Sequence, residues 1–188
     1  MCHRILGDAR LYALLRTFDL DLAAATRAGG CECGGVLHVA NYRRKPRGGS
    51  GEEDDLRFSF CCDREGCRAR ATPPSLRFLG RRVFLGAVVV LVSAMMNGLT
   101  PRRVADLSSL VGASERTLRR WRTWWRTAFT ESAFWRAAAG CFARPVALEA
   151  LPHSLLERFV GDERERLVAA LRFLSPITTT SAGSAMAS

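Results

Sequence analysis

Five of the seven cysteines lie between residues 31 and 67, in two short groups. Cys31 and Cys33 precede two glycines, and Cys62 and Cys67 enclose a segment that also contains a glycine. Zinc prefers thiolate ligands, and a structural zinc site completes a tetrahedron with four of them. Glycine beside a ligand lets the backbone fold around the sulfur. We therefore predict a zinc site formed by Cys31, Cys33, Cys62 and Cys67.

The spacing of these cysteines leaves alternatives for the ligand set. One residue separates the first pair and four separate the second, whereas about two are usual in a zinc knuckle. Cys61 could replace Cys62, and His38 could substitute for a thiolate. We favour Cys62 because it shares a strand face with Phe58 and Phe60, whose side chains should point inward. The alternative to a metal site is that these are unligated buried cysteines. A small hairpin with little apolar content, however, needs a bound metal ion to stabilise it.

The segment between the two cysteine pairs has the pattern of short strands. Strands are expected at residues 36–42 and 56–62, and a polar, glycine-rich loop at 43–55 should form a long, mobile connection between them. Two strands between two pairs of ligands are the arrangement of a zinc ribbon. Outside the ribbon, helical spacing of apolar residues predicts a helix from Ile5 to Ala28 and further helices up to Leu174.

The fold class that we predict is mainly α with a small β zinc ribbon and a trihelical helix-turn-helix unit. The expected organisation is an N-terminal helix at 1–28, the zinc ribbon at 29–75, the helix-turn-helix at 76–130, C-terminal helices at 131–174 and a disordered tail at 175–188.

Signals for two helices joined by a tight turn follow an apolar helix expected at residues 81–97. Thr100 can cap the first helix of the pair, and Pro101 suits its first position. Gly112 can take the left-handed conformation that ends a helix, and Ser114 can cap the next helix. Together with the apolar helix, this pair would complete the trihelical unit.

The second helix of the pair is amphipathic. One stripe of apolar side chains should pack on the neighbouring helices; its members are Leu118, Trp121, Trp125 and Phe129. The opposite face carries arginines, which a helix-turn-helix presents to bases and phosphates from the first turns of its second helix. An ordinary helical hairpin with a solvated arginine face is the alternative. The residues predicted to contact DNA are Ser114, Arg116, Thr117, Arg119, Arg120 and Thr123.

The composition agrees with a polyanionic partner. The net charge is +10, and of the 28 basic residues only Lys45 is a lysine. Such a charge favours double-stranded DNA as the partner, although biased codon usage could also explain the arginines. No secretory signal is visible at the N-terminus. The longest apolar run, at residues 83–96, is shorter than the roughly 20 residues that span a membrane, so we expect a cytoplasmic protein with reduced thiols and no membrane association.

The order of these motifs resembles the amino-terminal region of bacterial insertion-sequence transposases, in which a zinc ribbon precedes a helix-turn-helix. The resemblance covers roughly residues 29–130 and rests on Cys31-x-Cys33-Gly34-Gly35, Phe60-Cys61-Cys62-x4-Cys67-Arg68-x-Arg70, Thr72-Pro73-Pro74-Ser75 and Ser114-Glu115-Arg116-Thr117. It implies a transposase-related or regulatory DNA-binding factor, acting in transposition or in transcriptional control, with a ribbon that adds phosphate contacts or braces the fold.

Such transposases continue into a domain with three carboxylates that bind two metal ions. Here the acids after residue 130 fall on expected surface faces of helices, and no β-rich scaffold is expected to hold a two-metal site. We therefore expect no enzymatic activity. The acids are Glu131, Glu149, Glu157, Asp162, Glu163 and Glu165.

Two other functions stay open at this point. The chain could be a subunit of a nuclease or recombinase, or an interaction module that binds a transposase or another protein. The C-terminal helices, at 151–174, could mediate a homodimer or bind such a partner. The apolar residues suited to this role are Leu155, Leu156, Phe159, Leu167, Leu171 and Leu174.

Overall fold

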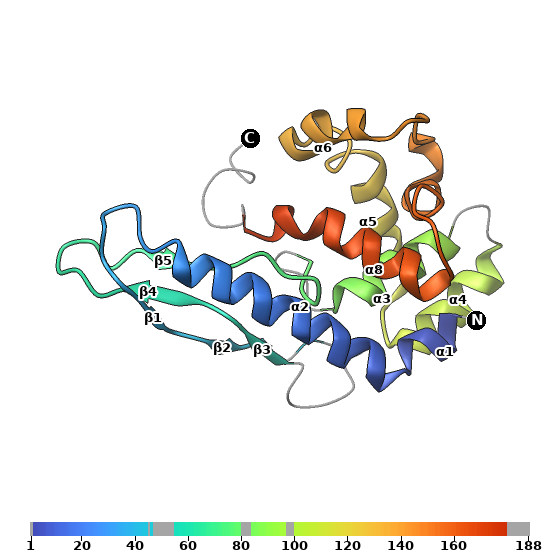
Figure 1. Ribbon diagram of the computed structural model, residues 1–188. Coiled ribbons are helices and arrows are strands. Elements are labelled where there is room, and N and C mark those ends of the chain that lie inside the picture. The colour runs from blue at the N-terminus through green and yellow to red at the C-terminus, as the bar shows by residue number, and fades with distance from the viewer. Residues whose placement is uncertain (1, 45, 47–54, 80–83, 97–99, 180–188) are drawn as a thin grey trace.

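One long helix, α2 (Ala9–Ala28), joins two unequal halves of the molecule. The computed structural model describes residues 2–44, 46, 55–79, 84–96 and 100–179. Within these residues the strands gather at one end and most helices at the other, and α2 runs beside both (Figure 1). Leu11 and Leu15 of α2 belong to the core of the helical half, whereas Ala23 packs in the core of the strand half.

The strand half contains two small antiparallel sheets. In the first sheet, β1 (Leu37–Val39) and β5 (Arg70–Ala71) flank the central strand β4 (Phe60–Cys62). In the second, β2 (Tyr42–Arg43) pairs with β3 (Leu56–Arg57). We call this half the ribbon. Its apolar core is small: among the residues that the structure describes, it contains five buried hydrophobic side chains, Ala23, Leu37, Phe58, Phe60 and Cys62.

The two strands expected from the sequence are confirmed, each divided into two short pieces. The additional strand β5 pairs with β4 through Phe60 opposite Ala71 and Cys61 opposite Arg70. Most of the loop expected at 43–55 lies outside the described residues.

The helical half is built around α3 (Gly86–Met95), which contacts α1, α5, α7 and α8. Valine and leucine side chains on all faces of α3 are buried, as a helix that is apolar all round requires. The surrounding elements are α1 (Cys2–Leu6), α4 (Pro101–Val111), α5 (Glu115–Arg126), α6 (Ala133–Ala138), α7 (His153–Leu156), α8 (Glu163–Leu174) and the 3-10 turns η2 (Ala139–Cys141), η3 (Leu148–Ala150) and η4 (Ser175–Thr178). Among the described residues, none of the helices combines the length and the apolarity needed to span a membrane.

The N-terminal helix is interrupted, which corrects the continuous helix predicted from Ile5 to Ala28. Asp8 has extended backbone angles and its side chain accepts a hydrogen bond from the backbone N–H of Arg10 at 2.9 Å. This is an N-cap, and it starts α2 as a new helix after α1. The apolar spacing is similar before and after the break, so periodicity alone did not reveal it.

The tail that we predicted to be disordered from residue 175 begins with an ordered turn. Residues 175–178 form the turn η4, in which Ser175 and Thr178 are buried. The hydroxyl of Thr178 accepts a hydrogen bond from the backbone N–H of Ser75 at 2.9 Å, so this turn is packed against the segment that follows the ribbon. Residues 180–188 of the predicted tail lie outside the described part of the chain.

The apolar residues that we expected to offer a dimer or partner surface on the C-terminal helices are used inside the chain. Leu155, Leu167, Leu171 and Leu174 are buried in the helical core, and Leu156 and Phe159 pack against it half-buried. These side chains stabilise the fold by the removal of apolar surface from water. A partner would therefore need a different surface.

Candidate metal centre and candidate nucleic-acid interface

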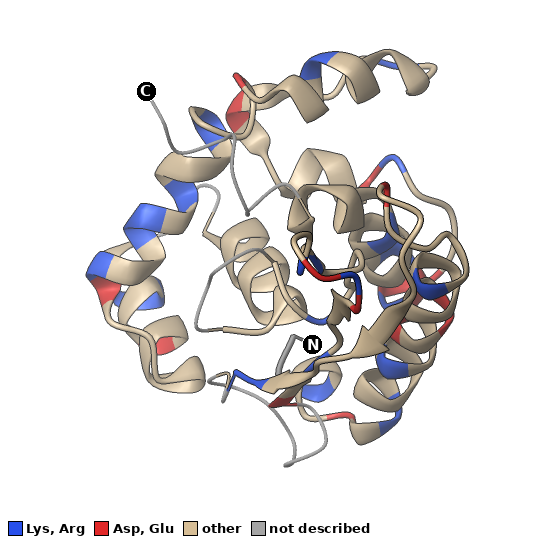
Figure 2. Ribbon diagram, turned by 90° about the vertical axis from the view of Figure 1, so that its left-hand side faces the viewer, with Lys and Arg blue, Asp and Glu red and all other residues tan. Residues whose placement is uncertain are grey.

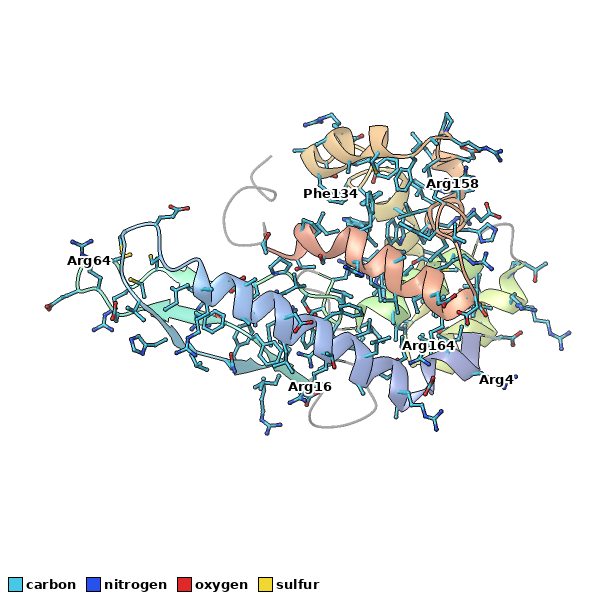
Figure 3. All side chains as sticks on the ribbon, in the orientation of Figure 1. Arg4, Arg16, Arg64, Phe134, Arg158 and Arg164 are labelled. Atoms are coloured by element: carbon cyan, nitrogen blue, oxygen red, sulfur yellow. The ribbon has the colours of Figure 1, made fainter. Side chains whose placement is uncertain are left out.

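Four cysteine sulfurs converge at the far end of the ribbon. The Sγ atoms of Cys31, Cys33, Cys62 and Cys67 all lie within 4.8 Å of one another. The Sγ of Cys31 is 3.7 Å from that of Cys67, and the Sγ of Cys33 is 3.5 Å from that of Cys62. A tetrahedral zinc ion with bonds of about 2.3 Å separates its sulfur ligands by about 3.8 Å. The four cysteines predicted as ligands are thus together and could hold a metal ion (Figure 3).

The first cysteine pair sits on a tight turn after α2. The backbone N–H of Gly34 donates to the carbonyl of Cys31 at 2.7 Å, and the N–H of Cys31 donates to the carbonyl of Gly35 at 3.2 Å. A Cβ atom placed on Gly35 would lie 2.5 Å from the Sγ of Cys62. A side chain at position 35 would therefore collide with the cluster, which explains the glycine at this position.

The second cysteine pair sits on the turn between β4 and β5. The backbone N–H of Cys62 donates to the carbonyl of Ala69 at 2.9 Å, and the N–H of Cys67 donates to the carbonyl of Arg64 at 3.1 Å. The guanidinium of Arg64 also donates to the carbonyl of Cys33, and so ties the two turns together. Figure 3 shows Arg64 at this end of the molecule, next to the sulfur atoms.

The thiols of the cluster differ in acidity. A backbone hydrogen bond from Gly35, followed by hydrogen bonds from Cys62 and Cys67, lowers the pKa of Cys33 to about 6. For Cys62 a backbone hydrogen bond from Arg64 lowers the pKa, but burial and the neighbouring thiols together raise it to about 12. The thiol contacts that lower the pKa of Cys33 thus go with raised pKa values of Cys62 and Cys67. A divalent cation in place of the protons would remove this difference between the thiols.

The two alternative ligands point elsewhere. The Sγ of Cys61 lies 3.6 Å from the carbonyl of Arg68, on the other face of β4. The Nε2 of His38 lies 3.4 Å from a carboxylate oxygen of Asp63. The geometry therefore favours Cys62 over Cys61 in the cluster, and it leaves His38 out.

The caps predicted for the helix pair α4 and α5 are confirmed. The hydroxyl of Thr100 accepts from the N–H of Arg103, and α4 ends at Gly112, whose φ of 63° is left-handed. The hydroxyl of Ser114 accepts from the N–H of Thr117 at 3.3 Å and starts α5. A turn of only three residues, 112–114, thus separates α4 from α5.

The apolar stripe of the second helix faces the interior, as expected. Leu118, Trp121, Trp125 and Phe129 are each at most 3% exposed. The ring of Phe84 packs edge-on against Trp121, with 5.0 Å between the centroids. The helix α5 ends at Arg126, so Phe129 reaches the same core from the turn that follows.

The opposite face of α5 is exposed and basic. Arg116, Arg119, Arg120 and Thr123 are exposed and line a shallow hollow along the helix. In Figure 2, basic segments mark this helix at the left of the view, whereas α3 in the centre carries none. Arg119 lies 3.9 Å from Glu115. Within the described residues, neither Arg116 nor Arg120 forms an ion pair with a carboxylate.

The other residues predicted to contact DNA have local roles at the start of α5. The hydroxyl of Ser114 caps α5, and it also lies 3.0 Å from the hydroxyl of Thr117. Ser114 is exposed, and Thr117 is half-buried and does not line the hollow. Trp124, which we did not include among the residues predicted to contact DNA, does line it. Its position, four residues after Arg120, places it on the same helical face and could have revealed it.

The acids of the C-terminal region do not form a second site. Within the part of the chain that the structure describes, the cysteine cluster is the only group of three or more potential metal ligands. Two of the acids, Asp162 and Glu165, form the capping box that starts α8. The other four, Glu131, Glu149, Glu157 and Glu163, are exposed or half-buried.

Comparison of the chain with protein-family models, with curated proteins and with solved structures found no match. The cysteine cluster and the basic face of α5 are therefore the two features on which a function can be built.

Proposed function

We propose that the chain is a double-stranded DNA-binding protein that places the exposed face of α5 in the major groove. The single observation that carries this proposal is the division of α5 into a buried aromatic face and an exposed face with Arg116 and Arg120. Guanidinium groups bind phosphates and guanine edges in a bidentate way. A helix whose other face is fixed in a core presents these groups in a defined orientation.

We also propose that the ion in the ribbon is zinc. Four thiolates in a tetrahedral arrangement select zinc or iron, and sulfur separations of 3.5 and 3.7 Å suit a single ion. In this proposal zinc closes a structural site, and the ribbon braces the fold or adds contacts to phosphates. The resemblance to the amino-terminal region of insertion-sequence transposases favours a cytoplasmic factor in transposition or transcriptional control, without catalysis of its own.

The proposal is tested by fluorescence anisotropy with a duplex selected from random DNA, at two salt concentrations. We expect the double variant R116A/R120A to lose at least about tenfold in affinity, because one bidentate contact to guanine contributes about 1–3 kcal/mol. If the contacts are to phosphates, the slope of the logarithm of the affinity against the logarithm of the salt concentration should become less steep by about one per arginine removed.

A matched control removes the same charge from another surface. Arg10 and Arg27 are exposed on α2, and the variant R10A/R27A should bind within about twofold of the parent if α5 makes the contacts and only long-range attraction is lost. Equal affinity of R116A/R120A and the parent would exclude α5 as the reading element.

A second candidate function is an interaction module for another protein. The observation that favours it is the exposure of apolar side chains on the ribbon: Val36 is 58% exposed and Val39 is 60% exposed. Apolar side chains that form a continuous exposed patch often mark a site that binds another protein. The absence of any DNA affinity of the parent at low salt would favour this function over the first.

A further inference from the structure

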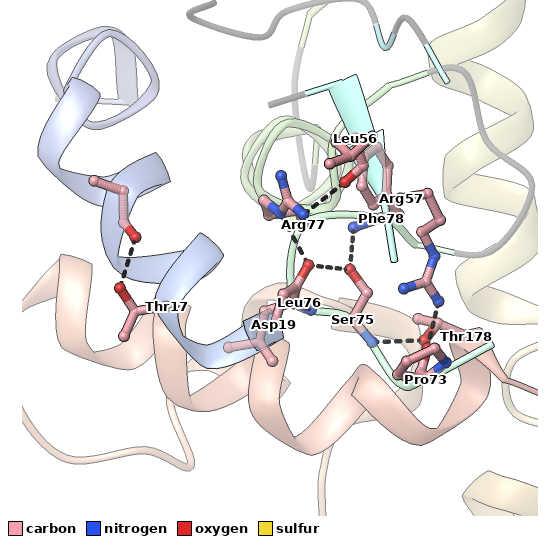
Figure 4. Close-up of polar contacts among 11 residues, drawn as sticks. Thr17, Asp19, Leu56, Arg57, Pro73, Ser75, Leu76, Arg77, Phe78 and Thr178 are labelled. Atoms are coloured by element: carbon pink, nitrogen blue, oxygen red, sulfur yellow. Dashed lines mark hydrogen bonds and ion pairs between the residues drawn. The ribbon is translucent and has the colours of Figure 1, made fainter. Parts of the chain in front are cut away.

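The ribbon and the helical half meet at a buried ion pair. Asp19 of α2 and Arg77, which follows the ribbon, have side chains with 0% exposure, and the Nε of Arg77 lies 2.9 Å from the Oδ2 of Asp19 (Figure 4). Asp19 also accepts hydrogen bonds from the hydroxyl of Ser75 and the backbone N–H of Leu76, both at 2.6 Å. Two charges are tolerated in an interior only while such a set of partners is complete.

Arg77 contacts both cores at once. Its terminal nitrogen donates to the carbonyl of Leu56 in β3 at 2.8 Å. Its guanidinium lies 5.2 Å from the ring of Phe58, in the ribbon core, and 5.2 Å from the ring of Phe78, in the helical core. Disorder of the ribbon would therefore remove one hydrogen-bond acceptor and one aromatic neighbour from a buried cation and would admit water beside it.

Contacts continue from Arg77 to the basic helix. The carbonyl of Arg77 accepts a hydrogen bond from the N–H of Gly86, the first residue of α3, at 2.7 Å. Just before α3, the ring of Phe84 packs on Trp121 of α5. Arg77 thus holds the start of the central helix, and Phe84, two residues before that helix, contacts the buried side of α5.

The ribbon has too little apolar surface to stay ordered without help, since the described part of its core contains only five buried hydrophobic side chains. A bound metal ion supplies the missing stability in such small units. We infer that metal binding at the four cysteines controls the stability of the helical half through the Asp19–Arg77 junction, and thereby the DNA affinity of α5. The part that concerns DNA rests on the proposed function.

The four tryptophans make this inference directly measurable. All of them lie in or against the core of the helical half, at positions 121, 124, 125 and 135, so tryptophan fluorescence reports the unfolding of that half. We compare the thermal midpoint of the full chain loaded with Zn²⁺, after treatment with a chelator, and after Zn²⁺ is added back. Chelation should lower the tryptophan midpoint by more than about 5 °C, which corresponds to a loss of about 1.3–2.5 kcal/mol in a chain of this size. Added Zn²⁺ should restore it.

Cysteine variants repeat the comparison without a chelator. Cys33→Ser removes a member of the cluster and should lower the tryptophan midpoint, whereas Cys61→Ser, outside the cluster, should leave it within about 2 °C of the parent. A double replacement, Asp19→Leu with Arg77→Met, exchanges the ion pair for apolar groups, as buried pairs often allow. In that variant, chelation should shift the tryptophan midpoint by less than half of the shift seen in the parent.

An unchanged tryptophan midpoint, together with loss of the metal by elemental analysis, would overturn the inference, because the ribbon would then be an independent unit. The comparison of the parent protein with and without bound metal decides this question even if the double variant fails to fold. Anisotropy on the same samples separates the two proposals. A metal-dependent midpoint in a parent that binds no DNA would support the coupling and refute the proposed function. DNA binding with a metal-independent midpoint would support the proposed function and refute the coupling.

Discussion

Cys61 and Cys62 are neighbours on β4, yet their sulfurs face opposite sides of the sheet. Cys62 is fully buried, and its Sγ lies 3.5 Å from that of Cys33. The Sγ of Cys61 instead lies 3.6 Å from the carbonyl of Arg68. Alternation of side chains along a strand allows only one of two adjacent residues to face the ribbon core.

The first prediction follows from this alternation. Cys62→Ser should reduce bound zinc well below one equivalent per chain, because it removes one of four ligands from a tetrahedral site. Cys61→Ser should keep one equivalent. Elemental analysis of the two purified variants and the parent decides the matter, and full zinc in Cys62→Ser with loss in Cys61→Ser would reverse the assignment. Iron in place of zinc in the parent would contradict the proposed identity of the metal.

The second prediction concerns the turn between α4 and α5. Gly112 has a φ of +63°, and an added Cβ would meet no other part of the protein within 4 Å, apart from the glycine itself and its adjoining backbone. Gly112→Ala should therefore lower the free energy of unfolding by about 1–2 kcal/mol through backbone strain alone, since an L-residue disfavours this conformation. Gly140 also has open space around it but no left-handed backbone, so Gly140→Ala is the control and should not destabilise the fold. Urea denaturation followed by circular dichroism gives both values, and equal values would exclude strain at Gly112.

The third prediction concerns the buried face of α5. Trp121 is 3% exposed and packs edge-on against Phe84. Trp121→Ala should cost about 3–5 kcal/mol in the free energy of unfolding, as large aromatic deletions in a core do. Trp124 is half-buried at the rim of the basic hollow, and Trp124→Ala should cost clearly less. A similar loss of unfolding free energy in the two variants would contradict the assignment of Trp121, but not Trp124, to the buried stripe of α5.

Local signals predicted the helix pair well. Thr100, Gly112 and Ser114 act within one turn of their own position, through a hydroxyl that accepts a backbone hydrogen bond or through a left-handed φ. Such effects depend on a few neighbouring residues and can be recognised in a single sequence. The clustering of the four cysteines was also predictable, although Cys33 and Cys62 are 29 residues apart, because short cysteine pairs are typical of sites that could hold one metal ion.

The junction between the two halves could not be predicted. Asp19 and Arg77 are 58 residues apart, and neither stands in a motif that requires the other. Charged side chains are rarely buried, so nothing in the sequence alone marks these two residues as a buried pair. The tertiary partners of Arg77 explain why this arginine is inside: the carboxylate of Asp19, the carbonyl of Leu56 and the rings of Phe58 and Phe78 surround its guanidinium. The same holds for Thr178, whose partner Ser75 is 103 residues away.

The last prediction uses the one acid among the residues of the basic hollow. Glu115 lies 3.9 Å from Arg119, and both side chains are about half exposed or more. An exposed pair of this kind contributes at most about 1 kcal/mol. Glu115→Gln should therefore strengthen DNA binding by up to about fivefold, because it frees Arg119 and removes a negative charge that repels phosphates.

The same substitution should weaken the fold slightly. Glu115 is the first residue of α5, where a negative charge interacts favourably with the helix dipole by about 0.3–1 kcal/mol. Glu115→Gln should thus raise the affinity for DNA while it lowers the free energy of unfolding, a combination that a merely structural role of Glu115 does not produce.

Asp21 is an exposed acid on α2, and Asp21→Asn is the control for the loss of one negative charge. It should change the affinity by less than about twofold, since screening by salt limits electrostatic effects over long distances. Anisotropy at two salt concentrations and urea denaturation measure the two quantities. Weaker DNA binding by Glu115→Gln than by the parent would show that the exposed face of α5 is not the surface that meets the phosphates.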